Sequence, residues 1–344
     1  MATLENSRQR RKLQLTGGST YVVSLPKKWI DDLKMKIGDE VTLIKNPNNS
    51  LTLLSSMDKF EAKKSIVEIS KDDSDESLKR KIIAIYLAGY KIIEIRSKGI
   101  KIQSSHARAI RELARTSMIG TEIVESSSES ISIQVLTRLP ELSFEVALRR
   151  MYLMASNMHR EAIDALVRMD KEAAEEVIKM DDEVDRFSLY MLRNLFQAVQ
   201  NGEILLEIGL KKPSDCLAYR TVIRCIERIA DHSVLIAKRI KFLNSPIDKK
   251  TLQSINQLSE SALKVFENSI QALTKNDYSL AEKVAVQAAK AVQDEKEFMS
   301  GLRESDSSSV IKFVLEDIRR TVEYSTDIAE VVINENIRSV ISEK

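Results

Sequence analysis

The stretch RQRRKLQLTGGSTYVVSLPKKWIDDLKMKIGDEVTLIKNPNNSLTLL, from Arg8 to Leu54, decides how the front of this chain folds. Leu13 and Leu15 alternate with polar neighbours, which is the spacing of a strand. A glycine-containing turn follows at 16–19, and the β-branched and aromatic run 21–25 favours a second strand. The pattern therefore predicts an N-terminal β-hairpin.

A second hairpin is expected after a short helix over 27–33. Gly38 marks a turn into a strand over 41–44, and Asn46–Asn49 makes the hairpin turn before a strand over 51–54. A unit of this size buries too little apolar surface to be stable alone, and this one contains no cysteine. We therefore expect a partner chain to complete its core.

The first 36 residues contain eight cations and only three acids, an excess of about five positive charges. Such a cluster binds nucleic acid with strong salt dependence, because each neutralised phosphate releases condensed counterions. The alternative is a solvated basic tail on a module that only pairs chains. The cations are Arg8, Arg10, Arg11, Lys12, Lys27, Lys28, Lys34 and Lys36.

The motif LPKKW at 25–29, followed by KIGDEV at 36–41, resembles the AbrB/SpoVT swapped-hairpin DNA-binding family over residues 8–55. The resemblance implies that two chains intertwine into one small β-barrel and present basic residues of both chains to double-stranded DNA. The DNA-binding candidates that it implies are Arg8, Arg10, Arg11, Lys12, Lys27 and Lys28. We assign residues 1–56 to this domain.

Composition limits the rest of the chain. Its 344 residues allow two or three domains, and scarce glycine and proline (9 and 5) favour helices. Cys216 and Cys225 fall nine apart in one expected helix, about 13 Å, which is too far for a disulfide and suits a reducing cytoplasm. No window suits a membrane span or a secretion signal, so a cytoplasmic protein without membrane insertion is expected.

Residues 57–139 predict a compact α/β domain with the order β-α-β-α-β-β. The expected elements are strand 65–69, helix 76–87, strand 91–96, helix 104–116 and a closing hairpin of 121–125 with 130–135. His106 lies beside Arg108, Arg111 and Arg115 on the second of these helices. A solvated surface is the default for such a face, and contact with an anion or a DNA backbone stays open.

From residue 140 to 344 the chain is expected to be almost all helix. The helices are expected at about 141–168, 171–202, 214–242, 250–275, 277–303 and 309–341. Similar residues recur in the two halves, as in Asp170 and Asp277 or Ser233 and Ser325. Two copies of a three-helix unit, at about 141–243 and 250–341, explain this recurrence.

Two pairs of acids mark the first copy. Asp181 and Asp185 lie four apart in one helix, and Glu227 and Asp231 do the same in the next, so each pair shares a helix face. Four carboxylates from two antiparallel helices can converge on one hard cation, and oxygen ligands favour Mg²⁺, Ca²⁺, Mn²⁺ or iron over zinc. Pairing with Arg186 and Arg228 on a solvated helix face is the alternative.

The segments MDDEVDRF at 180–187 and CIERIADHSVLIA at 225–237 resemble the PhoU family of phosphate-uptake regulators. The resemblance implies divalent or iron-type metal ions at Asp181, Asp185, Glu227 and Asp231. In the second copy the counterparts are Gln293/Glu297 and Arg319/Glu323, so each pair has lost its first acid. We expect at most one competent metal site, in the first copy. His232 follows Asp231 and is expected to be core or partner-facing, with orientation of a metal ligand as the alternative. His159 is expected to pack along its helix.

Both resemblances imply a DNA-binding transcription regulator of phosphate uptake, as in the archaeal arrangement in which the regulator carries its own DNA-binding module. A homodimer would bind DNA, and the helical half would sense phosphate status through metal, phosphate or a transporter ATPase. The alternative is an adaptor that restrains a phosphate transporter, with an N-terminal module that only dimerises. Without a nucleophile motif or a convergent general base, no enzyme is expected.

Overall fold

The computed structural model describes residues 8–45, 50–55, 63–97, 101–136, 142–243, 245–302, 308–337 and 340–341. It divides into two compact units, Met1–Glu61 and Ala62–Lys344, and each is described by itself. The domain boundaries expected near 56 and 140, the turn at Asn46–Asn49 and the breaks at Asn244 and Ser305 lie outside the described residues.

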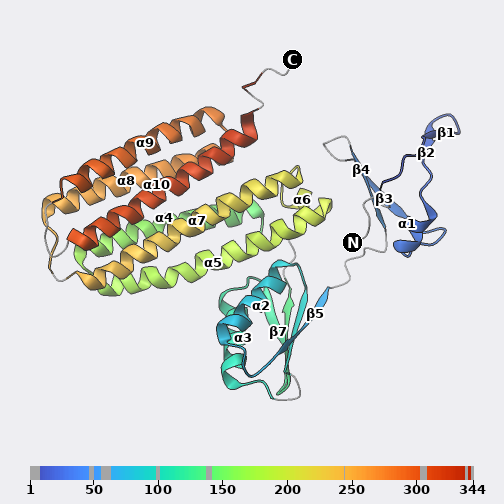
Figure 1. The fold of residues 1–344 in the computed structure, drawn as a ribbon, viewed down its shortest axis with the longest axis horizontal. Helices are drawn as coiled ribbons and strands as arrows, with labels where there is room; N and C mark the ends of the chain where they lie inside the picture. Colours follow the sequence, from blue (N-terminus) through green and yellow to red (C-terminus); the bar gives the residue numbers. More distant parts are fainter. Residues whose placement is uncertain are drawn as a thin grey trace. The chain divides into compact units, whose positions relative to one another are not determined.

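The N-terminal unit (Met1–Glu61) consists of two antiparallel hairpins around a short helix (Figure 1). Gly17 and Gly18, with φ of 63° and 79°, turn the first hairpin, because glycine adopts positive φ without a steric penalty. In the second hairpin Leu43 faces Leu53. The elements are β1 (Gln14–Thr16), β2 (Thr20–Val22), α1 (Lys27–Asp32), β3 (Val41–Lys45) and β4 (Leu51–Ser55).

The second unit begins with the expected α/β domain. Its sheet has the strand order β5–β6–β8–β7, and only β5 and β6 are parallel. The elements are β5 (Lys64–Ile69), α2 (Asp75–Leu87), β6 (Ile92–Ser97), α3 (Ser104–Thr116), β7 (Thr121–Ser126) and β8 (Ser130–Val135). The predicted order of strands and helices is therefore confirmed.

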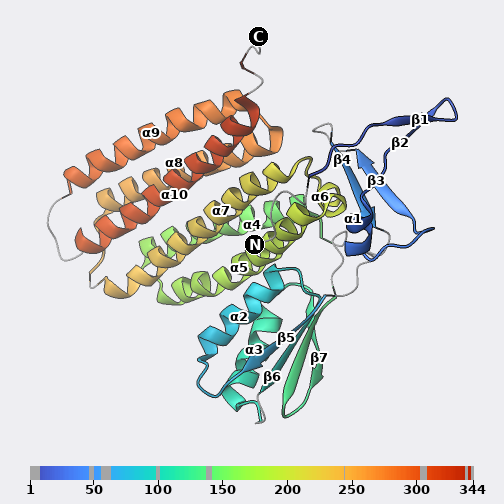
Figure 2. The same ribbon diagram turned by 45° about the vertical axis from the view of Figure 1, so that its right-hand side comes forward.

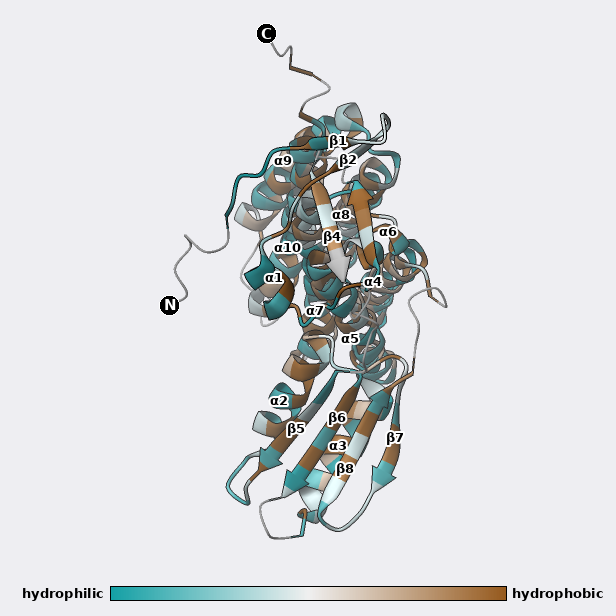
Figure 3. Cartoon of the chain, turned by 90° about the vertical axis from the view of Figure 1, so that its right-hand side faces the viewer, coloured by the Kyte–Doolittle hydropathy of each residue, from teal (hydrophilic) through white to brown (hydrophobic). Residues whose placement is uncertain are grey.

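One face of this sheet is covered by α2 and α3 (Figure 2). Ile93 and Ile133 face each other on neighbouring strands and pack into a core with Leu78 and Ile82 of α2. The other face is turned to the viewer in Figure 3, where α3 lies behind the strands. That face is polar at its centre, since Glu94 of β6 pairs with Lys64 at 2.7 Å.

The helical part consists of two three-helix bundles that contact each other through α7 and α10 (Figure 1). One bundle comprises α4, α5 and α7, and the other comprises α8, α9 and α10. The bounds are α4 (Phe144–Arg168), α5 (Lys171–Gln200), α6 (Gly202–Glu207), α7 (Pro213–Arg239), the 3₁₀ turn η3 (Ile240–Phe242), α8 (Lys249–Lys275), α9 (Tyr278–Ser300) and α10 (Ser308–Asn336). The six predicted long helices are confirmed.

The two bundles repeat the same junction between their first two helices. Met169 and Asn276 both adopt a left-handed conformation, with φ of 52° and 54°, and end α4 and α8. The next residue, Asp170 or Asp277, caps the following helix by accepting hydrogen bonds from its first backbone amides. This shared junction supports the internal repeat inferred from the sequence.

The helix α6 was not expected from the sequence, in which Gly202 indicated the start of a long break. Asn201 accepts hydrogen bonds from the amides of Glu203 and Ile204, at 2.8 and 3.3 Å, and so satisfies the exposed donors of the new helix. Burial of Ile204 and Leu205 then holds α6 against its neighbours. The sequence did not predict this helix because Gly202, which indicates a break, directly follows Asn201, which caps the helix.

The α/β domain contacts α5 through a buried arginine. Arg193 lies on α5, is 4% exposed, and donates to the backbone carbonyls of Tyr86 and Tyr90 near the end of α2. Gly89 lies between them with φ of 90°, and a Cβ there would be 3.1 Å from Gln197. These contacts fix the end of α2 on the same helix that carries Asp181 and Asp185.

Two further expectations concern cysteines and membranes. Cys216 and Cys225 are both free and buried, as their spacing predicted. In the part of the chain that the structure describes, no helix is both long and apolar enough to cross a bilayer.

Candidate functional site

Two groups of residues were candidates for function, and the first is the basic group of the N-terminal unit. Four of its members precede β1, and Lys27 and Lys28 begin α1. All six are exposed, and among the described residues none forms an ion pair with a carboxylate. Arg11 donates to the Gln9 side chain at 2.7 Å. The six, which stay candidates for DNA contact, are Arg8, Arg10, Arg11, Lys12, Lys27 and Lys28.

The same unit exposes most of its apolar side chains. Within residues 8–45 and 50–53, Pro26 is the one buried residue. Leu13, Tyr21 and Leu51 are 70%, 69% and 73% exposed, although strand residues of this kind normally pack into a core. A single chain therefore provides these hairpins with strands but with almost no hydrophobic interior.

The second group is the carboxylate face, defined as Asp181 and Asp185 of α5 with Glu227 and Asp231 of α7. The two helices are neighbours in the first bundle, and each carboxylate affects the proton affinity of others in the group. The expected placement of the two pairs on facing helices is therefore what the structure has. Asp185 and Asp231 are exposed, and the other two are partly buried.

Burial raises the proton affinity of all four acids, and repulsion between carboxylates adds to it for Asp181, Asp185 and Glu227. Burial raises the pKa of Asp181 to about 6, and the charges of Asp231 and Glu227 act in the same direction. The pKa of Asp185 is raised to about 7, by loss of water on its protein-facing side and by repulsion from its neighbours. Burial also raises the pKa of Glu227 and Asp231. Four crowded anions of this kind favour a bound cation or protons.

The present partners of these acids differ from the expected ones. Arg186 pairs with Glu183 at 2.7 Å, and Arg228 donates to the Tyr324 hydroxyl at 3.3 Å, so neither forms an ion pair with the carboxylate face. The charge of Arg228 nevertheless lowers the pKa of Asp231. Arg224, which the sequence did not single out, pairs with Glu227. Its position one turn before Glu227 is the signal that could have identified it.

The oxygen atoms of the carboxylate face are of the kind that binds a hard cation, but its side chains are not arranged around a common point. Oδ1 of Asp181 is buried without a hydrogen-bond partner, and all four groups offer oxygen ligands. However, no three His, Cys, Asp or Glu side chains among the described residues are arranged to hold a metal ion. Release of Glu227 from Arg224 would return its oxygens to the group.

Two family models match the chain. The model described as "PhoU domain" matches residues 148–240, which contain the whole carboxylate face. The chain carries a PhoU domain. Residues 14–61 match the model described as "Antidote-toxin recognition MazE, bacterial antitoxin", so the chain also carries an N-terminal MazE/AbrB-like domain. The basic residues before β1 precede that match.

Solved structures of PhoU proteins are similar to the helical part. The phosphate transport system regulatory protein PhoU from Streptococcus pneumoniae is 17% identical with a TM-score of 0.49, and the match covers 58% of this chain and 96% of that one. PhoU from Pseudomonas aeruginosa is 17% identical with a TM-score of 0.46, covering 57% and 96%. The comparison with curated proteins finds no match.

The second bundle lies beyond the matched PhoU domain, and its equivalent residues are differently arranged. Gln293 donates to Glu297 at 2.7 Å on α9. On α10, Arg319 pairs with Glu316 at 3.0 Å and with Glu323 at 3.1 Å. The guanidinium group thus lies among acids, as a cation would. That any metal binds in the first bundle stays a prediction.

A buried acid on α9 was not foreseen. Glu295 is 3% exposed, one of its oxygens has no partner, and burial raises its pKa. Its neighbour Lys296 lines a depression of about 400 Å³ between α9 and α10, together with Gln293 and Glu323. Glu295 falls at the apolar spacing of Ala288 and Ala291, which is the sequence signal that could have identified it.

The two histidines connect helices rather than joining the PhoU domain's carboxylate face. His159 is fully buried, with Nε2 3.0 Å from the Ser259 hydroxyl, and burial lowers its pKa to about 4. His232 contacts Asp317 of α10 through Nδ1 at 2.9 Å, and Asp317 also accepts from Arg239 at 2.6 Å. His159 therefore connects α4 to α8, and His232 connects α7 to α10.

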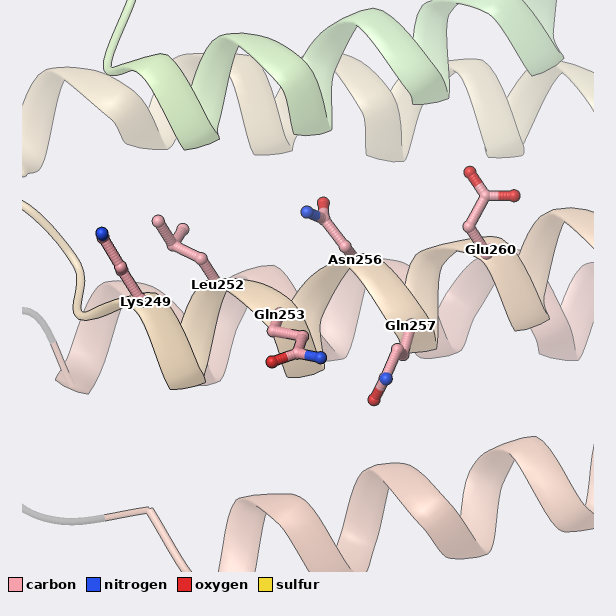
Figure 4. A pocket seen from close by; sticks show the side chains of 6 residues that line it. All are labelled: Lys249, Leu252, Gln253, Asn256, Gln257 and Glu260. Carbon is pink, nitrogen blue, oxygen red and sulfur yellow. The ribbon is translucent and has the colours of Figure 1, made fainter.

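A depression of about 530 Å³ follows one face of α8 (Figure 4). The side chains of Lys249, Leu252, Asn256 and Glu260 point to one side of the helix, whereas those of Gln253 and Gln257 point to the opposite side. All six lining residues come from one helix, so the depression is an open surface without an opposing wall. It contains neither the carboxylate face nor the basic group.

Proposed function

We propose that this chain is a DNA-binding transcription regulator of phosphate uptake. The observation that carries the proposal is a group of exposed cations, without carboxylate partners among the described residues, in and just before a MazE/AbrB-like domain that is joined in one chain to a PhoU domain. Cations that pair with no carboxylate remain available to phosphates. One chain therefore combines a basic surface suited to DNA with a domain of the family that regulates phosphate transport.

Dimerisation through the N-terminal unit is part of this proposal. The exposed leucines and tyrosine of the two hairpins would each contribute roughly 1.5–3 kcal/mol if a second copy covered them. A homodimer would place two copies of the basic residues 8–12 near one duplex. Two-fold symmetry then favours a pseudo-palindromic DNA site.

The helical half is the proposed sensor of phosphate status, through metal, phosphate or a transporter partner. Asp181, Asp185, Glu227 and Asp231 would hold a hard cation, which would neutralise their mutual repulsion. Glu227 would have to exchange Arg224 for the cation, so binding would free a guanidinium on α7. Because α5 also contacts the α/β domain through Arg193, a change at this face has a direct route toward the rest of the chain.

Fluorescence anisotropy on duplex DNA from upstream of a phosphate-transport operon tests the DNA-binding part. The full chain should prefer this duplex over a scrambled one and lose affinity steeply between two salt concentrations. The variant R10Q/R11Q/K12Q should bind every duplex more weakly, and its salt slope should fall by about 1 for each phosphate that the variant no longer neutralises.

The matched control is K283Q/K290Q/K312Q, which removes the same charge from exposed positions of α9 and α10. It should bind DNA as the unaltered chain does. Equal binding of the R10Q/R11Q/K12Q variant and this control would contradict the proposal. It would favour the adaptor that restrains a transporter and uses its N-terminal unit only to dimerise.

A further inference from the structure

The α/β domain has a stripe of arginines that its fold does not use. Arg108, Arg111 and Arg115 lie at spacings of three and four on α3, so they share one helix face. All three are exposed. Ile110 and Leu113 of the same helix are buried against the sheet and α2. The arginine stripe (Arg108, Arg111, Arg115) is therefore on the side of α3 opposite the core.

These arginines have no carboxylate partner among the described residues, unlike many surface cations of the helical part. There, Arg186 pairs with Glu183 at 2.7 Å and Lys264 with Glu267 at 2.8 Å, each within one turn. Within the stripe, Arg111 donates only to the Ser126 hydroxyl, at 3.3 Å. The guanidinium groups of the stripe therefore stay available to anions outside the chain.

The helix that bears the stripe is held firmly in the domain. The Nε2 atom of His106 lies 2.8 Å from the backbone carbonyl of Asp73, and the histidine is 3% exposed. The same nitrogen lies 3.8 Å from Oδ1 of Asp75, so the imidazole is used within the domain and is not available to an anion from outside the chain. The open alternative of an anion or DNA contact therefore depends on the arginines alone.

The dimensions of the stripe suit a nucleic-acid backbone. Arg115 lies seven positions after Arg108, which is about 10 Å along a helix. Phosphates of one DNA strand recur about every 3.4 Å along the duplex axis. Neighbouring phosphates lie farther apart than this rise because the strand also winds around the axis, so the stripe is long enough to contact more than one phosphate but not one for each rise of about 3.4 Å. Guanidinium groups bind phosphate oxygens in a bidentate geometry.

The covalent chain keeps this domain close to any DNA held by the N-terminal unit. Seven residues separate Ser55, the last residue of β4, from Lys63, where the described part of the α/β domain begins. Eight residue steps span at most about 28 Å. The α/β domain has 13 Lys and Arg against 10 Asp and Glu over residues 63–136, so its net charge also favours DNA.

We propose that the arginine stripe of α3 is a second DNA-contact surface, which binds the phosphate backbone beside the site held by the N-terminal unit. This inference rests on the proposed DNA-binding function. In this proposal the α/β domain lengthens the stretch of DNA that the protein contacts. The contact carries no base specificity, since phosphates are the same along every sequence.

The test compares R108Q/R111Q/R115Q with the charge-matched K283Q/K290Q/K312Q in salt-dependent anisotropy. One duplex just covers the site, and a longer one carries about ten added base pairs on each side, roughly one helical turn. The stripe variant should lose affinity only for the longer duplex. Its salt slope there should fall by about 1 for each phosphate that it no longer neutralises.

Three results are informative. Loss of affinity and slope only on the long duplex supports the stripe. A stripe variant that matches the control on both duplexes overturns it, even though the unaltered chain binds. No preferential binding by the unaltered chain overturns the proposed function itself, and the stripe with it. Thermal melting of the variant should stay within about 2 °C of the unaltered chain, because the arginines face solvent.

Discussion

At the scale of single residues, the carboxylate face makes stability depend on pH. The pKa of Asp185 is raised to about 7 in the folded chain, whereas an unfolded aspartate titrates near 3.9. Below about pH 4 the group is protonated in both states and has no effect. As pH rises toward 7, only the unfolded state loses the proton readily, so the folded state loses stability.

We therefore predict that Asp185→Asn stabilises the metal-free protein clearly at pH 7.5 and much less at pH 4.5, because the effect shrinks toward zero as pH falls to the unfolded pKa. The amide cannot ionise, so the repulsion from Asp181, Glu227 and Asp231 is reduced. The gain in melting temperature at pH 7.5 should be roughly 1–3 °C in the presence of a chelator. The control is Asp294→Asn at an exposed position of α9, far along the chain from the carboxylate face. Equal effects of the Asp185 substitution at both pH values would contradict this account.

Spacing alone predicted which acids share this face, because an interval of four residues fixes the direction of two side chains on a helix. The pairing of Glu227 with Arg224 was not predictable in the same way. Arg224, Arg228 and Arg186 are all within reach of the acids in sequence terms, and only packing decides which arginine turns inward. Whether the face binds metal stays a prediction.

At the scale of elements, Gly89 shows how the end of α2 is fitted to α5. Its φ of 90° favours glycine, and a Cβ would approach Gln197 to 3.1 Å. Gly209 has a similar φ of 82° after α6 but open space around it. Substitution of Gly209 therefore tests backbone strain alone, whereas substitution of Gly89 tests backbone strain together with crowding.

We predict that Gly89→Ala destabilises the chain more than Gly209→Ala does. Both substitutions should cost about 1 kcal/mol or more for the left-handed backbone, and only the first adds a clash with Gln197. Urea denaturation measures both. Adding Gln197→Ala should remove the clash. The extra cost of Gly89→Ala in the Gln197→Ala background should then fall to about the cost of Gly209→Ala in the unaltered chain. An additive double variant would show that the contact with α5 is unimportant.

The long helices and the strand order followed from sequence because apolar periodicity over many residues has few competing explanations. The helix α6 did not, since six residues contain too few periods, and Asn201–Gly202 indicates a break as readily as a cap. The role of Arg193 was also hidden, although an arginine within the apolar run MLRNLF is unusual. Its partners are carbonyls more than 100 residues earlier in the chain.

At the scale of the whole molecule, the chain combines an N-terminal unit without an interior and a second unit with complete cores. On β3 and β4, Val41, Leu43, Leu51 and Leu53 share one face of the hairpin. Leu43 is 66% exposed there, which gives this apolar face no partner within the described part of the unit. Sequence predicted that a second chain is needed, because too few residues are available to bury these side chains.

The last prediction concerns this association. Leu43→Ser should weaken a homodimer and, through it, DNA affinity, because a serine removes apolar area from the contact with the second chain. A loss of about 1–2 kcal/mol would raise the dimer dissociation constant roughly 5- to 30-fold, which sedimentation equilibrium can measure. Leu217→Ser is the matched control, since Leu217 is 68% exposed on α7 of the PhoU domain. A dimer weakened equally by both substitutions would move the main interface from the hairpins to the helical half. A DNA affinity that falls only with Leu43→Ser would tie DNA binding to the pairing of the N-terminal units, because each copy alone then presents too few cations to hold a duplex.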